Sequence, residues 1–167
     1  MIGESEALRD GVLDVAKLMA VAAKTAPKAR GIDNIKILIL NRREELEELA
    51  KSMEELAEKY GAFFKRDADN VRNSDVVVLI GATVVDLGLK TPEDYIADIN
   101  LVMALLNLGI ALGSAVKTAG IHNVDNRIMY TIGYAAQRKG LMKADIIIGI
   151  PLSAKGKNIY FDRKWPK

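Results

Sequence analysis

Apolar residues recur at helical spacing near the beginning of the chain. Leu8, Val12, Val15 and Met19 lie three or four residues apart within residues 5–24. This period predicts a helix with an apolar face directed toward the core. A proline and a glycine follow and predict that the helix ends before them.

Three short runs rich in Val, Ile and Leu predict buried strands, and they occupy residues 34–40, 75–81 and 145–150. The middle run, DVVVLIG, is the clearest, and its lack of alternation is typical of a strand covered on both faces. Residues 65–74 form a polar segment for which no helix or strand is predicted, and residues 153–167 are interpreted as a polar loop followed by a tail.

Polar residues at particular offsets predict two of the helix boundaries. Asn41 followed by Glu44 has the spacing of a capping box and predicts the start of a highly charged helix, which Gly61 is expected to close. Asp125 is predicted to cap a later helix that runs to about Lys139.

A long helix is expected to begin at residues 91–94, where Thr-Pro-Glu-Asp combines a capping hydroxyl, a first-turn proline and early acids. It includes residues 99–116, which carry no charge. That stretch would span about 27 Å, marginally enough to cross a membrane. Asn100, Asn107 and Ser114 within it favour a fully buried core helix, so no membrane association is predicted.

Strands interleaved with helices predict an α+β fold built as a three-layer α/β/α sandwich, with a doubly wound α/β fold as the alternative. A length of 167 residues and a hydrophobic content of 50% fit one domain over residues 1–167. The pattern leaves the strand order, and the choice between a parallel and a mixed sheet, open.

Composition excludes several kinds of chemistry. The chain has no cysteine, so disulfides, thiolate nucleophiles, zinc ribbons and cysteine-ligated iron–sulfur clusters are excluded. It has a single histidine, and no zinc or other metal site is predicted. A net charge of +2 gives no indication of a nucleic-acid partner.

The chain begins with acidic residues where a signal peptide would be basic, which predicts a cytoplasmic protein. Dense Glu and Lys runs, such as residues 42–59, are typical of heat-adapted proteins.

Three segments resemble the FMN-dependent nitroreductase fold. Residues 15–40 resemble its opening helix, Ala-Pro turn and first strand; residues 100–114 resemble its central helix; and residues 146–151 resemble its closing strand. Nitroreductases commonly have serine after Ala-Pro, where this chain has Lys28, and their N-terminal Arg-Ser-x-Arg phosphate motif has no counterpart here. The resemblance implies a homodimer with FMN in a cleft between subunits.

A second similarity is to a group of prokaryotic proteins described as ferredoxin-domain-containing. The segments that carry it are residues 25–34, 66–75, 108–119, 123–133 and 149–163. Members of that group commonly carry a cysteine cluster after the second buried strand, where residues 81–106 of this chain contain none. The chain is identified as a cluster-less member.

A flavin or another small anionic ligand requires cations and amide donors. The candidate cofactor-binding residues are Lys24, Lys28, Arg30, Asn107, Ser114, Lys117, Asn126, Arg127, Lys155 and Lys157.

Two of these groups have an alternative explanation. Asn100, Asn107 and Ser114 lie seven residues apart on one helix face. They are expected to contact either a ligand or, as a structural role, neighbouring backbone or a symmetry mate. Asn126 and Arg127 belong to a polar cluster in which capping accounts for one residue only. No catalytic residue is assigned, and His122 is given no role.

Two functional hypotheses follow. The first is a nitroreductase-like, FMN-binding redox protein acting as a homodimer. The alternative is a non-catalytic scaffold or small-ligand-binding domain that has lost the iron–sulfur centre of its relatives.

Overall fold

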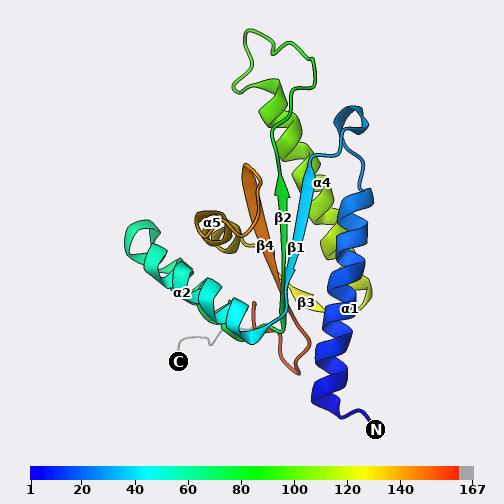
Figure 1. Ribbon diagram of the computed structural model, residues 1–167, viewed down its shortest axis with the longest axis vertical. Helices are drawn as coiled ribbons and strands as arrows, with labels where there is room; N and C mark the ends of the chain where they lie inside the picture. The colour runs from blue at the N-terminus through cyan, green and yellow to red at the C-terminus, as the bar shows by residue number, and fades with distance from the viewer. Residues whose placement is uncertain (162–167) are drawn as a thin grey trace.

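In the computed structural model, which describes residues 1–161, a four-stranded sheet lies between two layers of helices (Figure 1). The strands are β1 (Ile35–Leu40), β2 (Val76–Ala82), β3 (Asp125–Asn126) and β4 (Ile146–Ser153). The helices are α1 (Glu4–Thr25), the short 3-10 helix η1 (Ala29–Gly31), α2 (Arg43–Tyr60), α3 (Phe63–Arg72), α4 (Ile99–Ile121) and α5 (Tyr130–Arg138). The predicted three-layer α/β/α sandwich is confirmed.

The strand order is β1-β2-β4-β3, and each neighbouring pair is antiparallel. The doubly wound alternative is therefore wrong, because that fold requires parallel strands. In Figure 1 the start of β1 lies at the upper end of the sheet with the end of β2, and β3 lies at the lower end. These two ends are called the upper and lower ends below.

Strand β2 is buried along its whole length and separates two hydrophobic cores. Val78 and Ile80 belong to the core beneath α1 and α4, whereas Val77 and Leu79 belong to the core beneath α2, α3 and α5. Successive side chains of a strand point to opposite faces, so an uninterrupted apolar run supplies both layers. The predicted burial of this strand on both faces is confirmed.

Helix α4 begins later than predicted. Its cap is Asp98, whose carboxylate accepts hydrogen bonds from the backbone N–H groups of Asn100 (2.9 Å) and Leu101 (3.2 Å). Thr91 does contact the helix start, since its hydroxyl accepts from the Ile99 N–H at 3.0 Å, but it does so from the preceding loop. A capping hydroxyl distant in sequence satisfies the same orphan donors as a local one.

Two other boundaries also differ from prediction. The N-cap of α2 is Arg42, one residue later than the predicted Asn41. The side chain of Glu45 accepts a hydrogen bond from the Arg42 N–H at 3.1 Å. Asp125 caps no helix; it pairs with Ser153 in β3, and α5 starts only at Tyr130.

No helix is predicted within the polar segment 65–74, but most of its residues form α3. Phe64, Ala68 and Val71 are buried, and their spacing of four and three residues is that of a helix face. The charged residues between them concealed this period. The final strand continues to Ser153, and the predicted tail after residue 161 lies outside the described residues.

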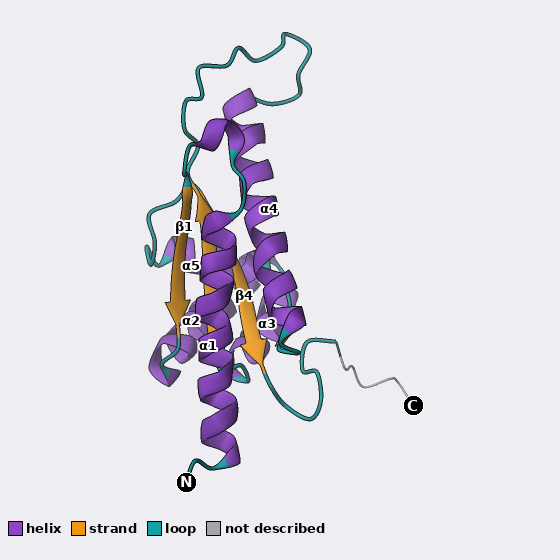
Figure 2. Cartoon of the chain, turned by 90° about the vertical axis from the view of Figure 1, so that its right-hand side faces the viewer, coloured by secondary structure: helices purple, strands orange, loops and turns teal. Residues whose placement is uncertain are grey.

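Helix α4 is buried along one face only. Figure 2 shows α1 and α4 side by side over the sheet, and Ala111 and Ala115 are buried there. Leu105, Leu106 and Ile110 are exposed on the opposite side, so the prediction of a fully buried helix is wrong. The helix is long and apolar enough to span a membrane by length and composition, but it packs against α1 and β2.

Candidate functional site

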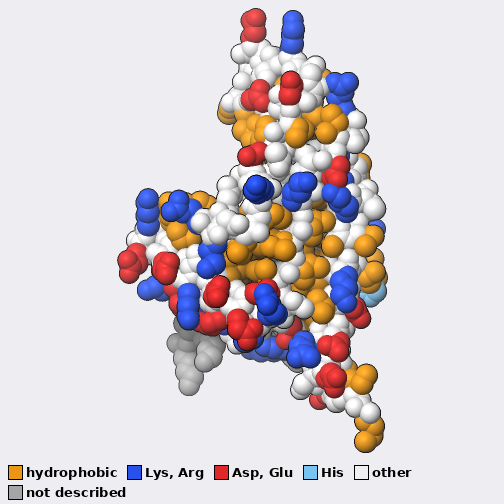
Figure 3. Space-filling model, in the orientation of Figure 1, with side chains coloured by type: hydrophobic (Ala, Val, Ile, Leu, Met, Phe, Trp, Pro, Cys, Tyr) orange, Lys and Arg blue, Asp and Glu red, His pale blue; other side chains and the backbone are white. Residues whose placement is uncertain are grey.

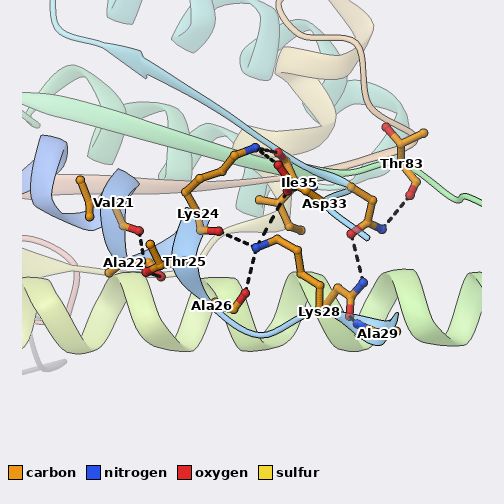
Figure 4. Close-up of polar contacts among 12 residues, drawn as sticks. Val21, Ala22, Lys24, Thr25, Ala26, Lys28, Ala29, Asp33, Ile35 and Thr83 are labelled. Atoms are coloured by element: carbon orange, nitrogen blue, oxygen red, sulfur yellow. Dashed lines mark hydrogen bonds and ion pairs between the residues drawn. The ribbon is translucent and has the colours of Figure 1, made fainter. Parts of the chain in front are cut away.

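The lysines predicted to bind an anion at the upper end are used within their own turn (Figure 4). The ammonium of Lys28 donates to the carbonyls of Lys24 (2.5 Å) and Ala26 (2.8 Å), and its side chain is only 7% exposed. Lys24 donates to the Ile35 carbonyl at 3.0 Å and forms an ion pair with Asp33. The hydrogen bond from Lys24 lowers the pKa of Asp33. These contacts close the turn between α1 and β1.

Asn107 joins that turn to α4. Its Oδ1 accepts from the Ala29 N–H at 2.9 Å, and its Nδ2 donates to Asn34 Oδ1 at 3.0 Å. Asn34 in turn donates to the carbonyl of Thr83 at 2.8 Å. The side chain of Asn107 therefore forms its hydrogen bonds with neighbouring segments of the chain. Of its two predicted roles, ligand contact or structural hydrogen bonding, this is the structural one.

Arg30 and Asn100 hold the loop between β2 and α4. Arg30 has a left-handed backbone (φ 54°), and its guanidinium donates to the Leu87 carbonyl. The Leu87 N–H donates to Asn100 Oδ1 at 3.0 Å. Leu87 is buried, so it is one of the residues that anchor this loop.

At the lower end, two predicted residues lie next to β3. Arg127 donates to the Tyr160 carbonyl at 3.2 Å, and its guanidinium lies 5.1 Å from the centre of the Phe161 ring. Asn126 donates to the Val124 carbonyl at 3.0 Å. Most of the N–H donors of Arg127 have no partner among residues 1–161.

The loop after β4 brings Lys155 and Lys157 to the same end. Lys155 donates to the Asn73 carbonyl at 2.5 Å, whereas Lys157 is exposed. Ser114 is half-buried and Lys117 is exposed on α4. The predicted residues thus form an upper group, a lower group and two positions on α4, and one protomer does not bring the upper and lower groups together.

Two cations that the sequence did not single out also lie at the lower end. Arg9 and Arg43 line a hollow of about 390 Å³ with Lys155. They come from α1 and α2, so only the fold places them beside the loop after β4. No motif in the sequence connects these three positions.

Two comparisons describe relatives of this sequence. The model of a family described as "Uncharacterized protein containing a ferredoxin domain (DUF2148)" matches residues 97–163. An "Uncharacterized protein" of Archaeoglobus fulgidus is 39% identical, and the match covers 98% of this chain and 97% of that protein.

Solved structures share the fold at low sequence identity. A nitroreductase with bound FMN from Desulfitobacterium hafniense matches with a TM-score of 0.63 and 14% identity, over 86% of this chain and 78% of that chain. A BluB-like flavoprotein from Clostridium difficile matches with a TM-score of 0.55 and 17% identity, over 94% and 85%. The predicted nitroreductase-like build is confirmed.

A third match concerns a longer protein. The hypothetical oxidoreductase YcnD of Bacillus subtilis has a TM-score of 0.61 and 14% identity, and the match covers 92% of this chain. This chain spans only 61% of the length of YcnD. At such identities the likeness describes the fold alone.

Proposed function

This chain belongs to the family of uncharacterized proteins containing a ferredoxin domain, and from that premise we propose that it is an FMN-binding redox protein that works as a homodimer. The observation that carries the proposal is the fold, which is that of a nitroreductase with bound FMN. The chain contains no cysteine, so its redox chemistry would come from the flavin and not from a thiolate-held cluster.

The outer face of α4 supports a homodimer. Leu105, Leu106 and Ile110 are exposed there, and a soluble monomer rarely leaves such a stripe open to water. Gly109 and Gly113 lie on the same helix, and a Cβ added at either would meet no atom of the protomer. The protomer itself does not require glycine at these positions, whereas a second copy approaching closely would.

The two glycines also lie near the middle of α4, which is about 34 Å long at helical rise. If α4 crosses α4 of a second copy there in an antiparallel manner, the upper end of one protomer comes next to the lower end of the other. The two separated groups of predicted binding residues would then meet across the interface. Such an arrangement would place a ligand cleft between the subunits.

The residues at the lower end suit an anionic cofactor better than those at the upper end. Arg127 keeps free N–H donors, and Lys157 is exposed without a carboxylate within ion-pair distance among residues 1–161. We infer that Asn126, Arg127 and Lys157 would hold the flavin phosphate. Lys24 and Lys28 do not fit this role, because their ammonium groups bind carbonyls and Asp33.

The test is a visible absorption spectrum of the purified protein, recorded before and after incubation with FMN and desalting. Retained bands near ~370 and ~450 nm, which flavins give, are the expected result. Arg127→Gln is expected to weaken FMN retention, and Lys24→Gln serves as the matched control because its partner is internal. A colourless protein that retains no FMN would reject the flavin proposal.

The second candidate function is a non-catalytic domain that uses the same fold for binding alone. The specific observation in its favour is that Lys24, Lys28 and Asn107 are all occupied by internal hydrogen bonds. Under this hypothesis the homodimer forms but the protein neither retains FMN nor accepts electrons. Sedimentation together with the spectrum separates the two functions.

A further inference from the structure

A hollow of about 390 Å³ opens at the lower end of the sheet. Its walls come from α1, the start of α2, the turn between α3 and β2, and the loop after β4. Figure 3 shows charged side chains gathered at this end, below an apolar surface in the centre of the view. Basic residues predominate in the lining, which includes Arg9, Arg43, Arg72 and Lys155 against the carboxylate of Asp75.

Two of these cations are fixed in position without being neutralised. Arg43 donates to the carbonyls of Arg72 and Ser74, the latter at 2.6 Å. Lys155 donates to the carbonyl of Asn73 at 2.5 Å. A carbonyl orients a cation but leaves its charge uncompensated, and both side chains retain further N–H donors. Neither cation has a carboxylate within ion-pair distance among residues 1–161.

The third cation has a different role. Arg72 is paired with Glu54 at 2.6 and 2.7 Å and with Glu47 at 3.1 Å, so carboxylates compensate its charge. Arg9 is exposed and lies 3.6 Å from Asp10. The uncompensated positive charge in the hollow is therefore concentrated on Arg43 and Lys155.

We propose that this hollow binds a small phosphomonoester that also carries hydroxyl groups. Arg43 and Lys155 would share the phosphate oxygens, since fixed cationic donors bind phosphate strongly. Asp75 would repel a bare phosphate but accepts hydrogen bonds from an attached hydroxyl group. The volume leaves room for that attached part. This inference is separate from the flavin proposal, because Asn126, Arg127 and Lys157 are absent from the lining of the hollow.

The test is isothermal titration calorimetry of the full chain with ribose 5-phosphate and, separately, with ribose. Binding of the phosphorylated sugar alone is expected, with an affinity that falls as salt is raised. Lys155→Gln is expected to weaken binding by about tenfold, because it removes a charge-assisted donor. Lys65→Gln, an exposed lysine of α3 that is absent from the lining, is the matched control and is expected to bind as the wild type does.

Three results would overturn the proposal: no binding of ribose 5-phosphate at low salt, equal binding of ribose, or equal losses in the two lysine variants. If the cations serve only to hold the end of α3, Lys155→Gln lowers the melting temperature while no ligand binds. FMN retention is measured on the same preparations. Sugar-phosphate binding without FMN retention would support this site while rejecting the flavin proposal.

Discussion

At the upper end of the sheet, Asn107 forms hydrogen bonds to segments that are far from it in the sequence. It lies on α4 and binds both the turn after α1 and Asn34 at the start of β1. It is almost completely buried, so an apolar replacement would leave the Ala29 N–H and the Asn34 amide without partners. Unsatisfied buried groups cost more than the net value of the bonds that are lost.

We therefore expect Asn107→Leu to lower the free energy of unfolding by about 2–4 kcal/mol. Ser114→Ala, two turns further along the same helix, is the matched control, since no hydrogen bond of its hydroxyl is found among residues 1–161. The control is expected to change the free energy by less than about 0.5 kcal/mol. Urea unfolding at one fixed protein concentration measures both, and equal effects would contradict the role given to Asn107.

Ionisation of Tyr160 is expected to make the free energy of unfolding depend on pH in alkaline solution. Burial raises its pKa well above the usual value, and its hydroxyl lies 2.8 Å from Ser74 Oγ. The pKa of Tyr160 is higher in the folded protein than in the unfolded chain, where it is about 10. The contribution of Tyr160 to the free energy of unfolding is therefore complete below about pH 10 and is lost as the pH rises beyond that value.

For Tyr160→Phe we expect a loss of about 1 kcal/mol at neutral pH, from the hydrogen bond to Ser74. Above about pH 10, however, the variant should lose less stability than the wild type, because its buried ring cannot ionise. Urea unfolding at pH 7 and at about pH 11 tests this difference. Parallel declines in the two proteins would show that another group controls alkaline stability.

At the scale of elements, the sequence predicted segments whose apolar residues form an unbroken pattern. The strands at β1, β2 and β4 and the helix α1 were predicted within a few residues of their observed bounds. Helix α3 was missed because its few buried apolar side chains are separated by charged residues that obscure the helical period. The start of α4 was misplaced because Thr91 contacts the helix start from the preceding loop, whereas the cap itself is Asp98.

The proposed crossing of two α4 helices makes a prediction for Gly109→Ala. In a monomer this change would stabilise the helix by about 0.8–1 kcal/mol, since the added methyl group meets no atom. At a close helix crossing the same methyl group pushes the helices apart. We therefore expect the dimer dissociation constant to rise at least about tenfold, which corresponds to 1.4 kcal/mol.

Gly120→Ala is the matched control for this experiment. It lies in the last turn of the same helix, and its added methyl group also has open space. It should leave the dissociation constant unchanged while raising thermal stability slightly. Sedimentation velocity measures both proteins, and equal dissociation constants would place the interface elsewhere.

At the scale of the whole molecule, the sequence predicted which residues were basic but not how the fold distributes them. Lys28 and Lys157 belong to the same predicted set, yet one is buried against carbonyls and the other is exposed. Arg43 was not singled out, although the fold directs it into a cationic hollow. Whether a cation is available to a ligand depends on carbonyls and carboxylates supplied by distant segments, which no local motif specifies.

The apolar outer face of α4 leads to a prediction for the whole molecule. A homodimer that buries this face unfolds to two separate chains. Its apparent melting temperature must then rise with protein concentration by mass action. For two chains of 167 residues, a tenfold increase is expected to raise it by about 2 °C. Differential scanning calorimetry over a hundredfold concentration range measures the slope, with Lys65→Gln on α3 as a control that should not alter it. A melting temperature that stays constant over this range would exclude the homodimer, and with it a ligand cleft shared between two copies of the chain.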